Sequence, residues 1–70
     1  MITLVQIREK LIEEIQNSGM SQAEIARQLG IRSQTVCNYV KGKKMPALDT
    51  FANLCKILDV DPAEILCTYD

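Results

Sequence analysis

Apolar residues recur every three or four positions along most of this chain, which is the spacing of helices that bury one face. Short segments rich in glycine, proline, serine or asparagine separate these stretches and predict turns. No stretch shows the alternation typical of a half-buried strand. The pattern predicts an all-α fold of five short helices, whose apolar positions are Leu4, Ile7, Leu11, Ile12 and Ile15, then Ala23, Ile25, Ala26 and Leu29, then Val36 and Val40, then Leu48, Phe51, Ala52, Cys55 and Leu58, and last Ile65 and Leu66.

Capping residues mark where the helices begin. In a capping box, a Ser or Thr at the N-cap and a Glu or Gln three residues later each accept the other residue's backbone N–H. We also expect Ser33 to cap the third helix, because serine is a favoured N-cap residue. Boxes or related caps are predicted for Thr3 with Gln6, for Ser21 with Glu24, and for Asp61 with Pro62 and Glu64.

Glycine and proline mark where helices end. Gly19, Gly30 and Gly42 each follow an apolar-periodic stretch, and glycine readily adopts the positive φ that terminates a helix. Pro46 disfavours the helical conformation at Met45, so the fourth helix should begin after it.

Residues 21–42 form the most informative segment, because they predict two short helices joined by a tight turn at Gly30. Ala26 is small enough to let the two helices approach closely, and Ile31 can fill the core beside the turn. This arrangement is a helix-turn-helix, whose second helix is suited to a DNA major groove. The residues expected on its outward face are Ser33, Gln34, Cys37, Asn38 and Lys41.

The charge distribution supports the same segment. The net charge is −1, but residues 1–24 carry −2 and residues 49–70 carry −4. Residues 25–48 contain no acid and carry +5. A basic segment between two acidic ones indicates a surface for nucleic acid, although a solvated basic face without a partner is the alternative.

The order of residues around this segment resembles the lambda-repressor-like, Cro-type (XRE-type) helix-turn-helix family of DNA-binding proteins. The resemblance extends over roughly residues 5–66, nearly the whole chain, and it implies a compact five-helix domain that binds duplex DNA. The matching positions are Gln22, Ala23, Glu24, Ala26, Gly30, Ile31, Val36, Tyr39, Gly42 and Pro46.

The resemblance also implies roles for individual residues. Gln22 matches a position that bonds a phosphate at the start of the second helix, where the helix dipole favours an anion. Many members have glutamine where this chain has Ser33, and serine is too short to pair with Gln22 in the same way. The base-contacting candidates are Ser33, Gln34, Cys37 and Asn38. The phosphate-contacting candidates are Gln22, Arg32, Thr35, Lys41, Lys43 and Lys44.

A second set of apolar residues falls outside the stripe predicted for the fourth helix or near the C-terminus. They predict an exposed patch through which two copies form a homodimer, with recognition helices about 34 Å apart on successive major grooves. The alternative is that they complete the core of one copy. The residues are Leu54, Ile57, Ile65, Leu66 and Tyr69.

Composition excludes several other functions. The chain has no histidine and its cysteines, Cys37, Cys55 and Cys67, are widely spaced, so we expect free thiols and no metal site. No cofactor, small-molecule ligand or enzymatic activity is expected, because no catalytic constellation is evident. We expect a single domain over residues 1–70 and a cytoplasmic location, with no membrane segment or signal peptide.

Together these observations predict a small transcriptional regulator of phage or plasmid type, most simply a repressor, with residues 33–41 in the major groove. The alternative is a protein-interaction module, such as an antitoxin or accessory factor. In that case the acidic C-terminal third would dock the partner protein.

Overall fold

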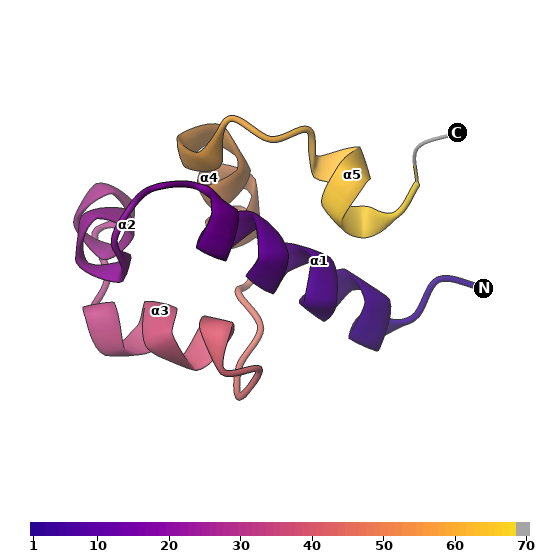
Figure 1. Ribbon diagram of the computed structural model, residues 1–70, viewed down its shortest axis with the longest axis horizontal. Coiled ribbons are helices and arrows are strands. Elements are labelled where there is room, and N and C mark those ends of the chain that lie inside the picture. Colours follow the sequence, from indigo (N-terminus) through magenta and orange to yellow (C-terminus); the bar gives the residue numbers. More distant parts are fainter. Residues whose placement is uncertain (69–70) are drawn as a thin grey trace.

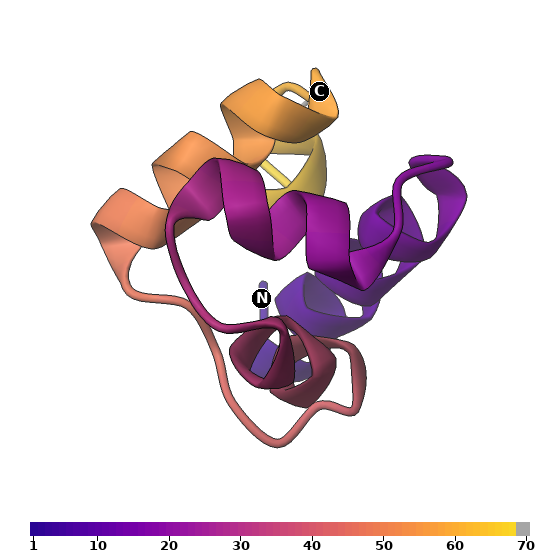
Figure 2. The same cartoon turned by 90° about the vertical axis from the view of Figure 1, so that its left-hand side faces the viewer.

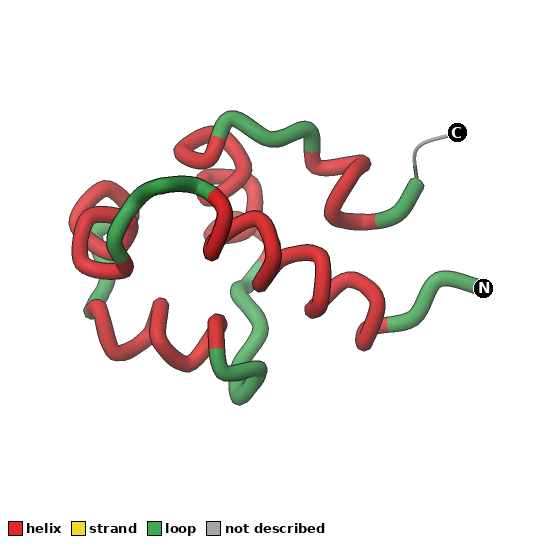
Figure 3. The backbone as a smooth tube through the Cα atoms, viewed as in Figure 1, coloured by secondary structure: helices red, strands yellow, loops and turns green. Residues whose placement is uncertain are grey.

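The computed structural model describes residues 1–68, and this part of the chain contains five helices and no strand (Figure 1). The predicted all-α, five-helix fold is confirmed. Three of the connections are short, and the longest link, residues 41–47, joins the third helix to the fourth (Figure 3). The helices are α1 Leu4–Asn17, α2 Gln22–Leu29, α3 Ser33–Val40, α4 Leu48–Leu58 and α5 Pro62–Leu66.

Helix α1 begins with the capping box that its sequence predicts. The Thr3 hydroxyl accepts the Gln6 N–H at 3.2 Å, and the Gln6 side chain accepts the Thr3 N–H at 2.8 Å. Leu11 and Ile15 are buried, and α1 packs against α5 and α3. Leu4, predicted to face the core, is 56% exposed because little of the described chain covers the first turn.

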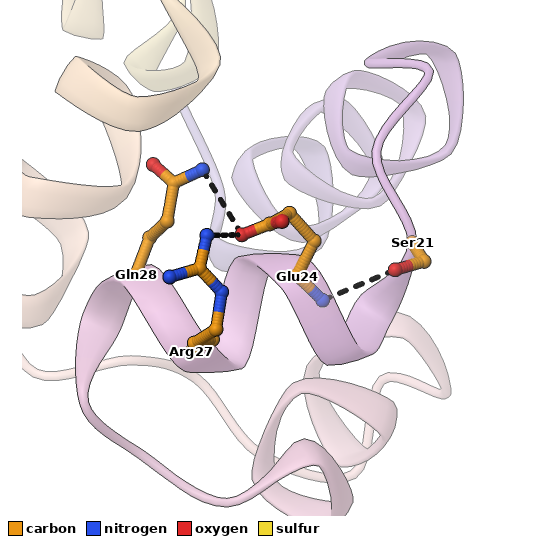
Figure 4. Close-up of polar contacts among 4 residues, drawn as sticks. All are labelled: Ser21, Glu24, Arg27 and Gln28. Atoms are coloured by element: carbon orange, nitrogen blue, oxygen red, sulfur yellow. Dashed lines mark hydrogen bonds and ion pairs between the residues drawn. The ribbon is translucent and has the colours of Figure 1, made fainter.

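Helix α2 has only half of the predicted capping box. The Ser21 hydroxyl accepts the Glu24 N–H at 3.1 Å, but the Glu24 carboxylate turns away from Ser21 and accepts from Arg27 and Gln28 (Figure 4). Ile25 and Ala26 are buried, and Leu29 is partly buried. Ala23 is exposed, so its predicted place in the core is wrong.

The turn between α2 and α3 depends on Gly30, which has a φ of 71°. Its N–H donates to the carbonyls of Ala26 and Arg27, and the Ile31 N–H donates to Ala26 at 3.0 Å. These bonds satisfy the last carbonyls of α2 while the chain reverses. Figure 2 shows α2 lengthwise and α3 end-on, so the two helices cross steeply as a helix-turn-helix requires.

Helix α3 starts one residue earlier than the predicted Ser33 cap allows. Arg32, not Ser33, holds the extended N-cap conformation, and its side chain makes no capping hydrogen bond. Ser33 is instead the first residue of the helix. The tight turn needs only residues 30–32, so the serine passes from the cap into the helix and the predicted Ser33 cap is wrong.

Helix α4 buries a face rotated by about one position from the predicted stripe. Phe51, Leu54 and Cys55 are buried, whereas Leu48 is 86% exposed and Ala52 is exposed as well. Two sets of positions on α4 have helical spacing. The first is 51, 54, 55 and 58, and the second is the predicted set 48, 51, 52, 55 and 58. The neighbouring helices select the first set.

Helix α5 is short and completes the core. The Asp61 carboxylate accepts the Ala63 N–H at 3.0 Å, and Pro62 occupies the first turn, as the sequence predicts. Ile65 is fully buried, as is Leu54 on α4. Neither side chain can therefore contribute to an exposed dimer patch, and their assignment to one is wrong.

Candidate nucleic-acid interface

Helix α3 separates an apolar inner face from a polar outer face. Val36 is fully buried and Tyr39 is 4% exposed, so both hold the helix against the core. Burial, and then the charge of Asp49, raise the pKa of the Tyr39 hydroxyl above its ordinary value of 10.0. Val40, predicted to face inward, is partly buried.

The outer face brings together all four predicted base-contacting residues. Ser33 and Gln34 are exposed, whereas Cys37 and Asn38 are half-buried one turn further along. The surface is narrow, uncharged and rich in groups that donate and accept hydrogen bonds, which is the chemistry needed to read base edges.

Gln34 and Asn38 are coupled by a side-chain hydrogen bond. The Gln34 Nε2 donates to the Asn38 Oδ1 at 3.2 Å, across one helical turn. This bond restrains both amide groups while Gln34 keeps its Oε1 acceptor and a second N–H donor. An amide with one acceptor and one donor side by side matches the N6 and N7 atoms of adenine.

Helix α2, which begins at Gln22, packs against α3. Gln22 is exposed at the first position of the helix, where backbone N–H groups lack helical partners. Ser21 occupies one of these groups, the Glu24 N–H. Gln22 makes no hydrogen bond to Ser33 within the described chain, so the two side chains remain separate.

The basic residues of the predicted set lie at the turn before α3 and in the link after it. Lys43 and Lys44 are exposed on a loop held by a 2.9 Å bond from the Lys43 N–H to the Asn38 carbonyl. Among residues 1–68, ion pairs join only Arg27 to Glu24 and Lys10 to Glu13. Of the five cations in residues 25–48, all except Arg27 therefore keep an uncompensated charge: Arg32, Lys41, Lys43 and Lys44.

The structure adds one cation that sequence patterns missed. Arg8 of α1 is half-buried, and its side chain lies against Gly42 in the loop after α3. The only sequence signal is a basic residue on the flank of the first helix. Thr35, the remaining predicted phosphate contact, is half-buried within α3.

Other possible sites are missing from the part of the chain that is described. Residues 1–68 contain no cluster of side chains that could hold a metal ion, and their three cysteines are unpaired. No helix in this part is both long and apolar enough to cross a membrane.

Comparison with known proteins identifies the arrangement. The sequence model of the helix-turn-helix family matches residues 11–65. The structure is similar to the restriction-modification controller protein C.AhdI from Aeromonas hydrophila, with a TM-score of 0.73 and 27% identity over 89% of this chain and 94% of that one. A search of curated proteins finds no match. This chain belongs to the helix-turn-helix family, as a DNA-binding transcription regulator of the XRE type.

Proposed function

We propose that this protein binds specific sequences of duplex DNA with α3 in the major groove and acts as a repressor. The observation that carries the proposal is the uncharged polar face of α3, flanked by the start of α2 and by four unpaired cations. Such a surface separates the two tasks of a sequence reader, in which base contacts specify and phosphate contacts position.

Base reading is assigned to the outer face of α3. The Gln34–Asn38 pair is central because its hydrogen bond presents two amides in a restrained arrangement. One bidentate amide contact contributes about 1–3 kcal/mol of discrimination against the wrong base. Ser33 and Cys37 flank the pair and contact neighbouring base edges or the sugar-phosphate backbone.

Phosphate contacts are assigned to both sides of α3. On one side, Gln22 and the free N–H groups of α2 bind a phosphate, favoured by the helix dipole. On the other side, Lys43 and Lys44 lie on the loop that follows α3. Arg32, Thr35 and Lys41 complete the set at the two ends of the helix.

We infer further that two copies associate, but through a different surface from the one that the sequence predicts. Ile57 and Leu66 are only partly buried and remain candidates, whereas Tyr69 lies outside the described residues. The exposed Leu4 and Val5, each 56% accessible, add apolar area on α1, which packs against α5. A two-fold dimer at this end would place both α3 helices about 34 Å apart on one face of the duplex.

Similarity to a controller protein supports a role in transcription regulation for this chain. The chain would repress by occupying the groove that the transcription machinery requires. This direction of regulation is tested by a promoter fusion that carries the bound sequence, since a repressor lowers its output and an activator raises it.

The DNA-binding assignment is tested by titrating variants on a sequence selected from random duplexes. Gln34→Ala should lose about 1–3 kcal/mol on the preferred sequence and relax preference at one base position. Lys43→Ala should weaken all duplexes alike and reduce the salt dependence. Lys56→Ala, on α4 outside the proposed surface, is the matched control and should bind normally. Equal behaviour of Gln34→Ala and the control would contradict the assignment.

A further inference from the structure

Arg8 connects α1 to the loop that follows α3. A Cβ atom built on Gly42 would lie 3.3 Å from the Cδ of Arg8, so the arginine stem crosses the backbone at close range. Gly42 has a φ of 73°, a conformation that glycine adopts without strain. In Figure 1 the loop that follows α3 lies beneath α1.

The guanidinium of Arg8 has no partner within the described chain. Its Nε atom is shielded from solvent and makes no hydrogen bond, and neither ion pair among residues 1–68 includes Arg8. A shielded polar group without a partner costs free energy, and a charged one costs more. Lys41 and Lys43, the neighbours of Gly42 in the chain, add positive charge beside it. No ion pair among residues 1–68 balances the charges of Arg8, Lys41 and Lys43.

We propose that Arg8 binds a phosphate of the DNA backbone from α1, beside the phosphate contacted by the loop. The inference rests on the proposed DNA binding. The terminal nitrogens of an arginine can hold two phosphate oxygens at once, and the anion would relieve the repulsion among the clustered cations. The contact surface then extends from the helix-turn-helix onto the first helix, and Gly42 leaves room for the arginine stem.

A structural role is the competing explanation, because the end of α3 carries a partial negative charge that also attracts a cation. The two roles differ in their salt dependence. Each phosphate contact contributes about 0.9 to the slope of log affinity against log salt, so one contact weakens binding about 3-fold between 50 and 200 mM salt. A cation that only packs against α3 contributes nothing to this slope.

The test measures affinity for the selected duplex over that salt range, together with thermal stability. Arg8→Gln keeps a polar side chain without charge and should lower the slope by about 0.9, equally on any sequence. Arg8→Lys should keep the slope, since it retains the charge. Lys10→Gln is the matched control on the same helix, because Lys10 lies near Glu13 at 3.9 Å, and it should leave the slope unchanged.

An unchanged slope in Arg8→Gln, with reduced thermal stability, would overturn the inference. Arg8→Ala is the second neutral variant, because alanine is the best helix former, and it should reproduce the lower slope. Unfolding of both neutral variants would also overturn it, since Arg8 would then serve the fold. If the wild-type protein shows no salt-dependent, sequence-selective binding, the proposed function itself fails. If the wild type binds and Arg8→Gln matches it, only the role of Arg8 fails.

Discussion

Replacing Ile65 with alanine tests how α5 is held to the rest of the protein. Helix α5 has five residues, which is far too short to be stable alone. Its Ile65 side chain is completely buried in the core, and α5 packs against α1. Removing that side chain should leave a cavity where the last helix docks. The sequence pattern had instead placed Ile65 on an exposed dimer patch, so this variant separates the two interpretations.

The expected loss is large for a domain of this size. Truncating a fully buried isoleucine to alanine lowers the free energy of unfolding by about 2–5 kcal/mol. Stability of about 0.05–0.15 kcal/mol per residue gives this 70-residue chain roughly 4–10 kcal/mol in total. Ile65→Ala should therefore remove about a fifth or more of the free energy of unfolding. With a urea m-value of about 1 kcal/mol/M, the midpoint should fall by about 2 M or more.

The assay is urea unfolding followed by far-ultraviolet circular dichroism at two protein concentrations. Leu66→Ala is the matched control, because Leu66 is the next residue of α5 and is only partly buried. It should cost less than Ile65→Ala at both concentrations. The reasoning is refuted if Ile65→Ala unfolds at the wild-type midpoint, or if its loss disappears when the protein concentration is raised.

Three further predictions concern the turn, a helix cap and alkaline pH. Gly30→Ala should lower the free energy of urea unfolding by about 1 kcal/mol, because no atom would lie within 4 Å of the new Cβ and only the positive φ of 71° opposes it. Gly30→Asn should lower it less, and equal losses for the two variants would contradict this cause. Ala47→Ser should raise the free energy of unfolding by about 0.5–1 kcal/mol, because Ala47 has an extended N-cap conformation and makes no side-chain capping bond. An unchanged free energy of unfolding would show that the first N–H groups of α4 are already satisfied. Burial raises the pKa of Tyr39 and Cys55, with smaller contributions from Asp49 and Asp61, so both groups ionise at lower pH in the unfolded chain than in the folded one. The free energy of unfolding should accordingly stay constant below the ordinary thiol pKa of 9.0 and decline as pH rises beyond it. Cys55→Ala should delay this decline to the pH range where tyrosine ionises. An unchanged decline in that variant would contradict the assignment.

Local signals in the sequence predicted local structure well. The Thr3 capping box, the left-handed Gly30 and the Asp61 cap each depend on a few neighbouring residues, and all three occur in the structure. The Ser33 cap failed because it depends on the length of the turn. That length is set by how α2 and α3 pack together, which no single residue encodes.

Tertiary packing decided the remaining differences. Two stripes on α4 satisfy helical spacing equally, and the packing of α4 against α2 is what places Leu54 in the core and Leu48 on the surface. The polar face of α3 was predictable because its inner residues are apolar. The place of Arg8 could not be predicted, because its contact with Gly42 lies between residues more than thirty positions apart. That contact depends on how α1 is rotated about its axis.

Parallel selection from random duplexes tests the central claim, that α3 reads DNA sequence, most directly. Wild-type protein and Gln34→Ala are selected under the same moderate salt. The account predicts an enriched palindromic sequence for the wild type, with half-sites about 10 base pairs apart. It also predicts that Gln34→Ala enriches the same sequence with preference lost at one symmetric position. No enriched sequence for the wild type, or identical sequences with identical preferences for both proteins, would contradict the account.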